Sequence, residues 1–303
     1  MKELLDLRGI ITVLNTPFNA QDEIDLPSLK RNVSVAIDAG VAGFLVPAMA
    51  SEVGKLTLSE RAAMVSAVLA ETRGRIPVIG GASAANAQER LQAAETLVKL
   101  GCTGILVSIP FENERQYEQD VRAVAEVKPG FLMLQDWDAS GFGVPVALIA
   151  RLFAEVDAFR SLKIEVVPAG VKYSQVLAAT GGRLHVCGGW AVLQIIEALD
   201  RGVHAFMPTG MHPIYTRIFN RYASGDREAA RLLFNRLLPV LAFSNQHLDI
   251  SIHFFKQLLY QQGIYSTPRV RPPILEFDSI HQKIANEMIG LVQEITRNLE
   301  TEG

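Results

Sequence analysis

The stretch Val98-Lys-Leu-Gly-Cys-Thr-Gly-Ile-Leu-Val-Ser108 joins the end of one expected helix to the whole of one expected strand. Gly101 stands where helices commonly end, because glycine adopts the left-handed backbone conformation of a C-terminal cap without steric cost. The residues Gly104–Ser108 that follow are almost continuously apolar, which is typical of a strand covered on both faces. The stretch therefore predicts a helix followed by a buried parallel strand.

The same alternation of short apolar runs with longer segments of helical periodicity continues on both sides of this stretch. Strands are predicted at Gly9–Leu14, Gly43–Val46, Pro77–Gly80, Gly104–Ser108, Gly130–Gln135, Phe159–Ile164, Leu184–Cys187 and Ala205–Met207. The helices expected between them are Leu26–Ala39, Ser59–Glu71, Asn86–Leu100, Glu114–Val127, Pro145–Val156, Val171–Ala179 and Trp190–Arg201.

Eight strands alternating with helices predict an α/β fold, a (β/α)8 TIM barrel that occupies residues 1–225. A doubly wound sheet is the alternative. It is disfavoured because Asn15-Thr-Pro-Phe18 follows the first strand, where a dinucleotide-binding sheet would carry Gly-x-Gly-x-x-Gly. From Asp226 to Glu300 the pattern is helical, interrupted only at Gly263–Pro273, so residues 226–303 are expected to form a C-terminal helical extension packed on the barrel.

Composition excludes several classes of protein. The 303 residues, 49% of them hydrophobic and 20% charged, are enough to bury a large core. The formal net charge of -3, with Lys and Arg scattered among acids, provides no basic surface for nucleic acid. Cys102 and Cys187 lie far apart without a CxxC pair, so we expect two buried thiols rather than a disulfide or a zinc site. Neither a metal nor another cofactor is expected.

The N-terminal segment Met1–Arg8 lacks the long apolar region of a secretory signal. No apolar run reaches the roughly 18 residues that a membrane span requires. We therefore expect a cytoplasmic protein without a membrane partner.

Reactive side chains of a TIM barrel lie at the C-terminal ends of its strands. Lys163 occupies such a position in Phe159-Arg-Ser-Leu-Lys-Ile-Glu165. Desolvation at an apolar barrel mouth favours the neutral amine, which can attack the carbonyl of a 2-oxo acid and form a Schiff base. A solvated lysine at a strand end is the alternative. Lys172 is a weaker candidate, because we expect it to remain solvated at the start of a helix, and a lone His212 is more often structural.

The other strand ends supply further candidates. Asp136, Asp138 and Glu165 could carry protons as catalytic acids or bases. Glu52 is expected to anchor its own loop through backbone hydrogen bonds. Backbone N–H groups after the second strand could hold a substrate carboxylate, and glycines after the seventh could leave room for substrate. The substrate-binding residues predicted in this way are Thr16, Ala48, Met49, Ala50, Ser51, Gln135, Trp137, Gly188 and Gly189.

Several motifs together resemble one family. They are Thr16-Pro-Phe18, Gly40-Val-Ala-Gly43, Leu56-Thr-Leu-Ser-Glu-Arg61, Ile76-Pro-Val-Ile-Gly-Gly81, Leu162-Lys-Ile-Glu165 and Val270-Arg-Pro-Pro273. With them the chain resembles, from Gly9 to about Pro273, the class I aldolases that include dihydrodipicolinate synthase and N-acetylneuraminate lyase. The resemblance implies a barrel with a helical extension, a homotetramer, binding of pyruvate or a related 2-oxo acid, and Lys163 as the imine-forming residue.

The chain also departs from this family. Ala48-Met-Ala-Ser-Glu52 stands where the family usually has Gly-Thr-Thr-Gly-Glu, so two hydroxyl groups are missing. Gln135-Asp-Trp-Asp138 stands where Tyr-Asn-x-Pro is expected, and glutamine cannot replace tyrosine as a proton carrier. We therefore expect a divergent member that is not an authentic dihydrodipicolinate synthase.

Three functions follow from these observations. The first is a Schiff-base-forming lyase or aldolase that acts on a pyruvate-like 2-oxo acid through Lys163. The second is a dehydratase or hydratase that uses the same imine. The third is a barrel that binds a small ligand without turnover. In each case the expected partner proteins are further copies of this chain, in a tetramer or a dimer.

Overall fold

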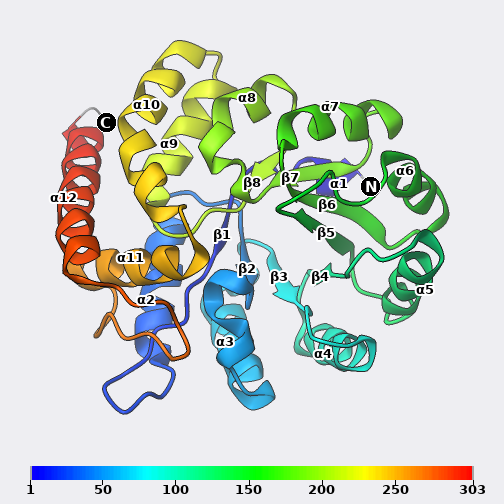
Figure 1. The fold of residues 1–303 in the computed structure, drawn as a ribbon, viewed down its shortest axis with the longest axis horizontal. Helices are drawn as coiled ribbons and strands as arrows, with labels where there is room; N and C mark the ends of the chain where they lie inside the picture. The colour runs from blue at the N-terminus through cyan, green and yellow to red at the C-terminus, as the bar shows by residue number, and fades with distance from the viewer. Residues whose placement is uncertain (1, 302–303) are drawn as a thin grey trace. The chain divides into compact units, whose positions relative to one another are not determined.

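The computed structural model describes residues 2–301 and contains a closed barrel of parallel strands that pair in chain order (Figure 1). The strands are β1 Gly9–Val13, β2 Gly43–Val46, β3 Val78–Gly81, β4 Gly104–Ser108, β5 Leu132–Asp138, β6 Phe159–Val166, β7 His185–Gly188 and β8 Ala205–Phe206. The predicted TIM barrel is confirmed.

The helices alternate with the strands and continue after β8. The α-helices are α1 Lys2–Leu5, α2 Leu26–Asp38, α3 Leu58–Thr72, α4 Ala87–Leu100, α5 Glu114–Ala125, α6 Val146–Glu155, α7 Ala169–Ala179, α8 Ile195–Asp200, α9 His212–Ala223, α10 Arg227–Ser244, α11 Leu248–Gln261 and α12 Ser279–Thr301. The 3-10 helices are η1 Met49–Ser51, η2 Val53–Lys55 and η3 Trp190–Gln194.

The helices near the end of the barrel differ from the sequence prediction. The helix expected over Trp190–Arg201 is divided into η3 and α8. Helix α9 was not predicted, although Pro213 stands in its first turn, where the missing N–H of proline costs nothing. Its buried Ile214 and Ile218 have the four-residue spacing of one helix face. The signal for α9 was therefore present in the sequence.

Local capping explains the ends of α4. The side chain of Asn86 accepts a hydrogen bond from the backbone N–H of Glu89, and this satisfies one free donor of the first turn. Gly101 ends the helix in the left-handed conformation, with φ of 95°. The chain then enters β4, so the sequence signal at Gly101 is confirmed.

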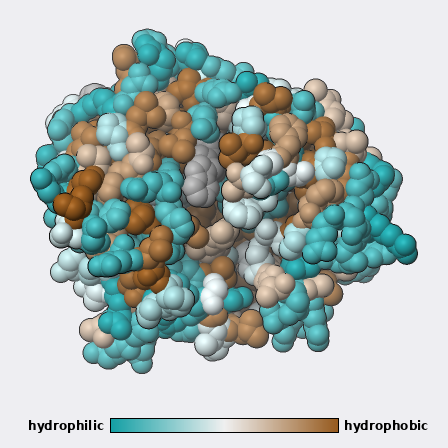
Figure 2. All heavy atoms as spheres, in the orientation of Figure 1, coloured by the Kyte–Doolittle hydropathy of each residue, from teal (hydrophilic) through white to brown (hydrophobic). Residues whose placement is uncertain are grey.

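The described residues group into two compact units. The first contains the chain up to Ile11, Ala42–Val46 and Arg73–Pro208. Its strands β2 to β7 are almost wholly buried, and the surface over α5 is largely hydrophilic (Figure 2). Cys102 and Cys187 both belong to this unit and are buried free thiols, as expected.

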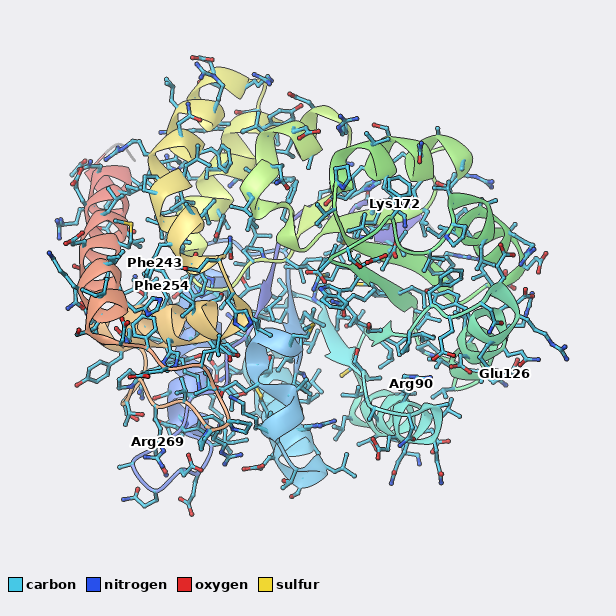
Figure 3. The ribbon with its side chains drawn as sticks, viewed as in Figure 1. Arg90, Glu126, Lys172, Phe243, Phe254 and Arg269 are labelled. Carbon is cyan, nitrogen blue, oxygen red and sulfur yellow. The ribbon has the colours of Figure 1, made fainter. Side chains whose placement is uncertain are left out.

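The second unit contains Thr12–Val41, Pro47–Thr72 and the chain from Thr209 onward. Within it, Phe243 of α10 meets Phe254 of α11 edge to face, with ring centroids 5.7 Å apart (Figure 3). The division into a barrel of residues 1–225 and an extension of residues 226–303 stays a prediction. Among the described helices, none combines the length and the apolar character needed to cross a membrane.

Candidate active site

Lys163 and Glu165 form a close pair on β6. Side chains alternate along a strand, so two residues in positions i and i+2 face the same side of the sheet. The Nζ atom of Lys163 lies 3.1 Å from Oε1 of Glu165, and the two side chains are only 7% and 9% exposed. The structure thus places a candidate nucleophile beside a carboxylate that can exchange a proton with it.

Neighbouring strands hold the Glu165 carboxylate in place. Gln135 of β5 is in register with Lys163, and its Nε2 group donates a hydrogen bond to Oε2 of Glu165. A Cβ atom at Gly189, after β7, would collide with the same carboxylate. Because Gly189 has φ of -92°, it is required here for space and not for an unusual backbone conformation. Gly188 is paired with Phe206 in the strand ladder.

Strands β6 and β7 also carry buried polar side chains that are neutral at pH 7. Cys187 is in register with Lys163, and Ser161 lies two residues before the lysine on β6. The hydroxyl group of Ser161 is 2.8 Å from Nδ1 of His185. Burial lowers the pKa of His185 to about 4 and raises that of Cys187 to about 12, so both side chains are neutral at pH 7.

Asp136 takes part in a different cluster. It follows Gln135 on β5, so its side chain points to the opposite face of the sheet. There it forms a buried ion pair with Lys172 of α7 (Figure 3), and Oδ1 accepts a 2.9 Å hydrogen bond from the backbone N–H of Val144. Lys172 also donates to the backbone oxygens of Phe142 and Val144.

The expectation that Lys172 is solvated was wrong, because its side chain is 0% exposed. Burial lowers the pKa of Lys172 and raises that of Asp136, although each charge acts in the opposite direction on its partner. The pair fills the space between β5 and α7 and has a structural role. The structure does not bring Asp136 together with Lys163.

The remaining residues of this loop are more exposed. Asp138 accepts hydrogen bonds from the backbone N–H groups of Ser140 and Gly143, at 3.0 and 3.1 Å. The N–H group of Ser140 lowers the pKa of Asp138. Asp138 therefore holds its own loop together. Trp137, in register with Glu165, is 50% exposed.

Thr16 and residues 48–51 come together within the second unit. The hydroxyl of Thr16 donates to the backbone oxygen of Ser51 at 2.6 Å, and the amide of Asn15 donates to that of Ala50 at 2.7 Å. The hydroxyl of Ser51 accepts from the backbone N–H of Ala48 and donates to the oxygen of Leu14. The Ser51 hydroxyl is thus engaged in the structure of the loop. Met49 is 44% exposed.

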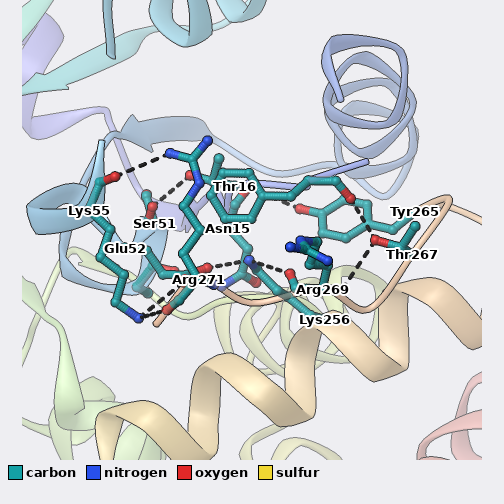
Figure 4. A network of polar contacts seen from close by, with 12 residues as sticks. Asn15, Thr16, Ser51, Glu52, Lys55, Lys256, Tyr265, Thr267, Arg269 and Arg271 are labelled. Atoms are coloured by element: carbon teal, nitrogen blue, oxygen red, sulfur yellow. Dashed lines mark hydrogen bonds and ion pairs between the residues drawn. The ribbon is translucent and has the colours of Figure 1, made fainter. Parts of the chain in front are cut away.

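Glu52 anchors this loop through a buried network that the sequence did not reveal (Figure 4). Its carboxylate pairs with Lys256 of α11, and both side chains are 0% exposed. The second carboxylate oxygen accepts hydrogen bonds from Nζ of Lys55 at 3.2 Å and from the backbone N–H of Arg271 at 3.1 Å. The expected anchoring role of Glu52 therefore rests mainly on two lysines. A role of Thr16 and residues 48–51 in carboxylate binding stays a prediction.

His212 is a structural residue, as the sequence indicated. It is buried between Thr12 and Asn32, whose side chains lie 3.2 and 3.0 Å from its two ring nitrogens. Burial lowers the pKa of His212 to about 4. Within residues 2–301, no group of three or more His, Cys, Asp or Glu side chains is placed to hold a metal ion.

Sequence comparison now identifies the family. A model of the dihydrodipicolinate synthetase family matches residues 6–291. The chain belongs to this family. Members of the dihydrodipicolinate synthetase family are lyases or dehydratases, and this supports the expectation that the protein is an enzyme.

Relatives of this chain within the family differ in activity. L-2-keto-3-deoxyarabonate dehydratase from Azospirillum brasilense is 26% identical in an alignment of 298 residues that covers 95% of this chain and 94% of the dehydratase. Dihydrodipicolinate synthase from Rhodopseudomonas palustris has a similar structure, with a TM-score of 0.88 and 19% identity over 95% of this chain and 98% of the synthase. A prophage protein of the family from E. coli K12, solved in complex with pyruvate, has a TM-score of 0.85 and 20% identity over 95% of this chain and 98% of its own. The two structures establish the shared fold alone.

Proposed function

We propose that this protein is an imine-forming lyase that acts on a pyruvate-like 2-oxo acid through Lys163. The observation that supports this proposal most strongly is the 3.1 Å pair of Lys163 and Glu165, nearly excluded from solvent in the C-terminal half of β6. An amine in such a site, next to a proton acceptor, is suited to attack a carbonyl. The proposal adds to the family assignment a nucleophile and a proton carrier.

In the proposed reaction Glu165 takes a proton from the ammonium group of Lys163, and the amine attacks C2 of the 2-oxo acid. The protonated Glu165 then gives its proton to the carbinolamine hydroxyl, which leaves as water. The carboxylate next takes the proton of a C4 hydroxyl while the C3–C4 bond breaks and its electrons enter the imine. Glu165 protonates the resulting enamine at C3, and hydrolysis releases the product and Lys163.

This scheme does not need the tyrosine that the family resemblance led us to expect. Gln135 occupies that position and donates a hydrogen bond to Glu165, so it orients the carboxylate without moving a proton. Asp136 and Asp138 have no part in this scheme. Asp136 is paired with Lys172, and Asp138 accepts a hydrogen bond from the backbone N–H of Gly143 in its own loop.

The second candidate is a dehydratase with the same imine. A dehydratase is among the relatives that match almost the whole chain, and this similarity favours the alternative. Glu165 would take a proton from C3 of the imine and give it to the C4 hydroxyl, which would then leave as water. Product analysis with a 4-hydroxy-2-oxo acid separates the two, because cleavage releases pyruvate and an aldehyde whereas dehydration keeps the carbon chain whole.

Borohydride trapping tests the proposal. Incubation with pyruvate and borohydride should add a reduced adduct to the peptide that contains Lys163, and Lys163→Ala should abolish it. Lys99→Ala is the matched control, because Lys99 is 78% exposed on α4 and its adduct yield should equal that of the wild type. Glu165→Gln should slow adduct formation by about 100-fold.

Failure of wild type to form the adduct, or an undiminished adduct in Lys163→Ala, would remove the imine mechanism. Saturable 2-oxo-acid binding without turnover on a broad substrate panel would instead indicate a binding protein without catalytic activity.

We further propose a cytoplasmic homo-oligomer, a tetramer or a dimer, on the basis of the family resemblance. Light scattering of the purified chain measures its mass, and a monomer would contradict this assembly.

A further inference from the structure

A cavity of about 470 Å³ opens beside Glu165 in the first unit. Its volume lies within the range of about 300 to 1,000 Å³ that is usual for small-molecule sites. Apolar side chains make up most of its wall, among them Trp137, Val167, Pro168 and Val171. Three of these are strongly exposed, Val167 at 65%, Trp137 at 50% and Val171 at 47%, so the wall is open to a ligand.

The cavity and the proposed nucleophile share one side chain. Glu165 lines the cavity, and its carboxylate lies 3.1 Å from Nζ of Lys163. A 2-oxo acid joined to Lys163 through C2 would therefore have this space next to the rest of its carbon chain. The 2-oxo-acid group itself is too small to occupy such a volume, so the cavity is available for the distal part of a longer substrate.

The charge of the wall restricts what that distal part can be. Among the lining residues that the structure describes, the charged ones are Glu165 and Glu197, and none is Lys, Arg or His. Arg201 lies near the rim, but its guanidinium group is paired with Glu197 at 2.9 Å and also donates to the hydroxyl of Ser174. A second carboxylate or a phosphate in this space would lose water and meet negative charge without a free cation.

The polar groups of the wall suit hydroxyl groups instead. The carboxylates of Glu165 and Glu197 can accept hydrogen bonds, and the amide of Gln194 can both donate and accept. The indole of Trp137 provides an apolar face beside them. This combination is complementary to a carbon chain that carries hydroxyl groups and no charge.

We infer that the cavity takes the distal part of the substrate, and that this part is an uncharged, hydroxylated chain and not a second anionic group. The inference rests on the proposed imine at Lys163 and adds the substrate class to it.

Two 2-oxo acids with five carbons each test this inference, 4,5-dihydroxy-2-oxopentanoate and 4-hydroxy-2-oxoglutarate, which differ in the terminal group. The measured quantity is the concentration that gives half-maximal borohydride trapping on Lys163. This concentration should be at least about tenfold lower for the dihydroxy acid, a difference of 1.4 kcal/mol. Because trapping does not require turnover, the test also serves if the protein binds without catalysis.

Val171→Arg would place a cation in the cavity wall, and its position in a helix with an exposed side chain makes the change compatible with folding. It should lower the half-maximal concentration of the dicarboxylate at least about tenfold relative to that of pyruvate. Val35→Arg on α2, where the valine is 37% exposed, is the matched control and should change none of these values.

Two results distinguish failure of this inference from failure of the proposed imine-forming function. A pyruvate adduct together with equal half-maximal concentrations for the two longer acids would overturn the inference and keep the imine. Absence of any adduct, with pyruvate or with either longer acid, would overturn both.

Discussion

Replacement of Lys172 by methionine should destabilise the protein by about 3 to 5 kcal/mol, because it would leave the Asp136 carboxylate buried without a cation. The structure supports the upper part of this range. Lys172 and Asp136 are 0% and 1% exposed, and the lysine also donates to the backbone oxygens of Phe142 and Val144. Each carbonyl that loses its donor adds a desolvation cost of about 1 kcal/mol or more.

The double variant Lys172→Met/Asp136→Leu distinguishes a lost pair from lost packing. It removes both charges and keeps most of the buried volume, so it should recover at least about half of the loss of the single variant. The recovery should be incomplete, because the N–H group of Val144 loses its acceptor on Asp136.

Urea unfolding followed by circular dichroism measures these differences at pH 7. Lys99→Met is the control, because Lys99 is 78% exposed and 3.9 Å from its partner Glu95, and its effect should stay within about 0.5 kcal/mol. An equal effect of Lys172→Met and Lys99→Met would refute the reasoning. So would a double variant that loses as much stability as Lys172→Met alone, or more.

Three further predictions concern the site and the response to pH. Gly189→Ala should reduce kcat by about 10- to 100-fold, because the new methyl group displaces the Glu165 carboxylate. The Tm should change little. Steady-state assays measure kcat, and thermal melts measure the Tm. His212 has a native pKa of about 4, below the 6.5 of an unfolded histidine, so its contribution to stability is complete above pH 6.5 and is lost as the pH falls toward 4. The free energy of unfolding that is lost between pH 7 and 5 should be about 2 kcal/mol smaller in His212→Gln than in the wild type. Urea unfolding at several pH values measures this loss, and an equal loss in variant and wild type would contradict the burial argument. A hydrogen bond from Arg271 holds the pKa of Glu60 at about 2. Glu60→Gln should therefore cost about 1 kcal/mol of stability at pH 7, after allowance for solvent screening. It should also reduce the stability lost on acidification from pH 4.5 to 2, and thermal unfolding measures both effects.

The barrel could be predicted because its signal repeats along the chain. The predicted bounds of Gly43–Val46 and Gly104–Ser108 agree with β2 and β4, where an apolar run begins and ends with the strand. Strand β5 continues to Asp138 and β6 to Val166, beyond the predicted ends. Both predictions stopped just before an acidic side chain, Asp136 or Glu165, whereas the ladder of backbone hydrogen bonds does not depend on side-chain polarity.

The candidate site was predictable where it depends on one strand. Lys163 and Glu165 are two residues apart, so strand alternation alone places them on one face. The partner of Asp136 could not be found in this way, because Lys172 belongs to a helix that meets β5 only in the folded protein. The same holds for Glu52 and Lys256, which are 204 positions apart in the chain.

The location of Lys163 and Glu165 on a single strand has an evolutionary consequence. The separation of these two side chains is set by the pleat of β6, which every strand in the barrel shares, and not by a loop. Loops such as Ala139–Gly143, and the wall formed by Val167–Val171, can therefore change in sequence without moving these two groups apart. A lineage could in this way exchange one substrate for another while it inherits the same lysine–carboxylate pair.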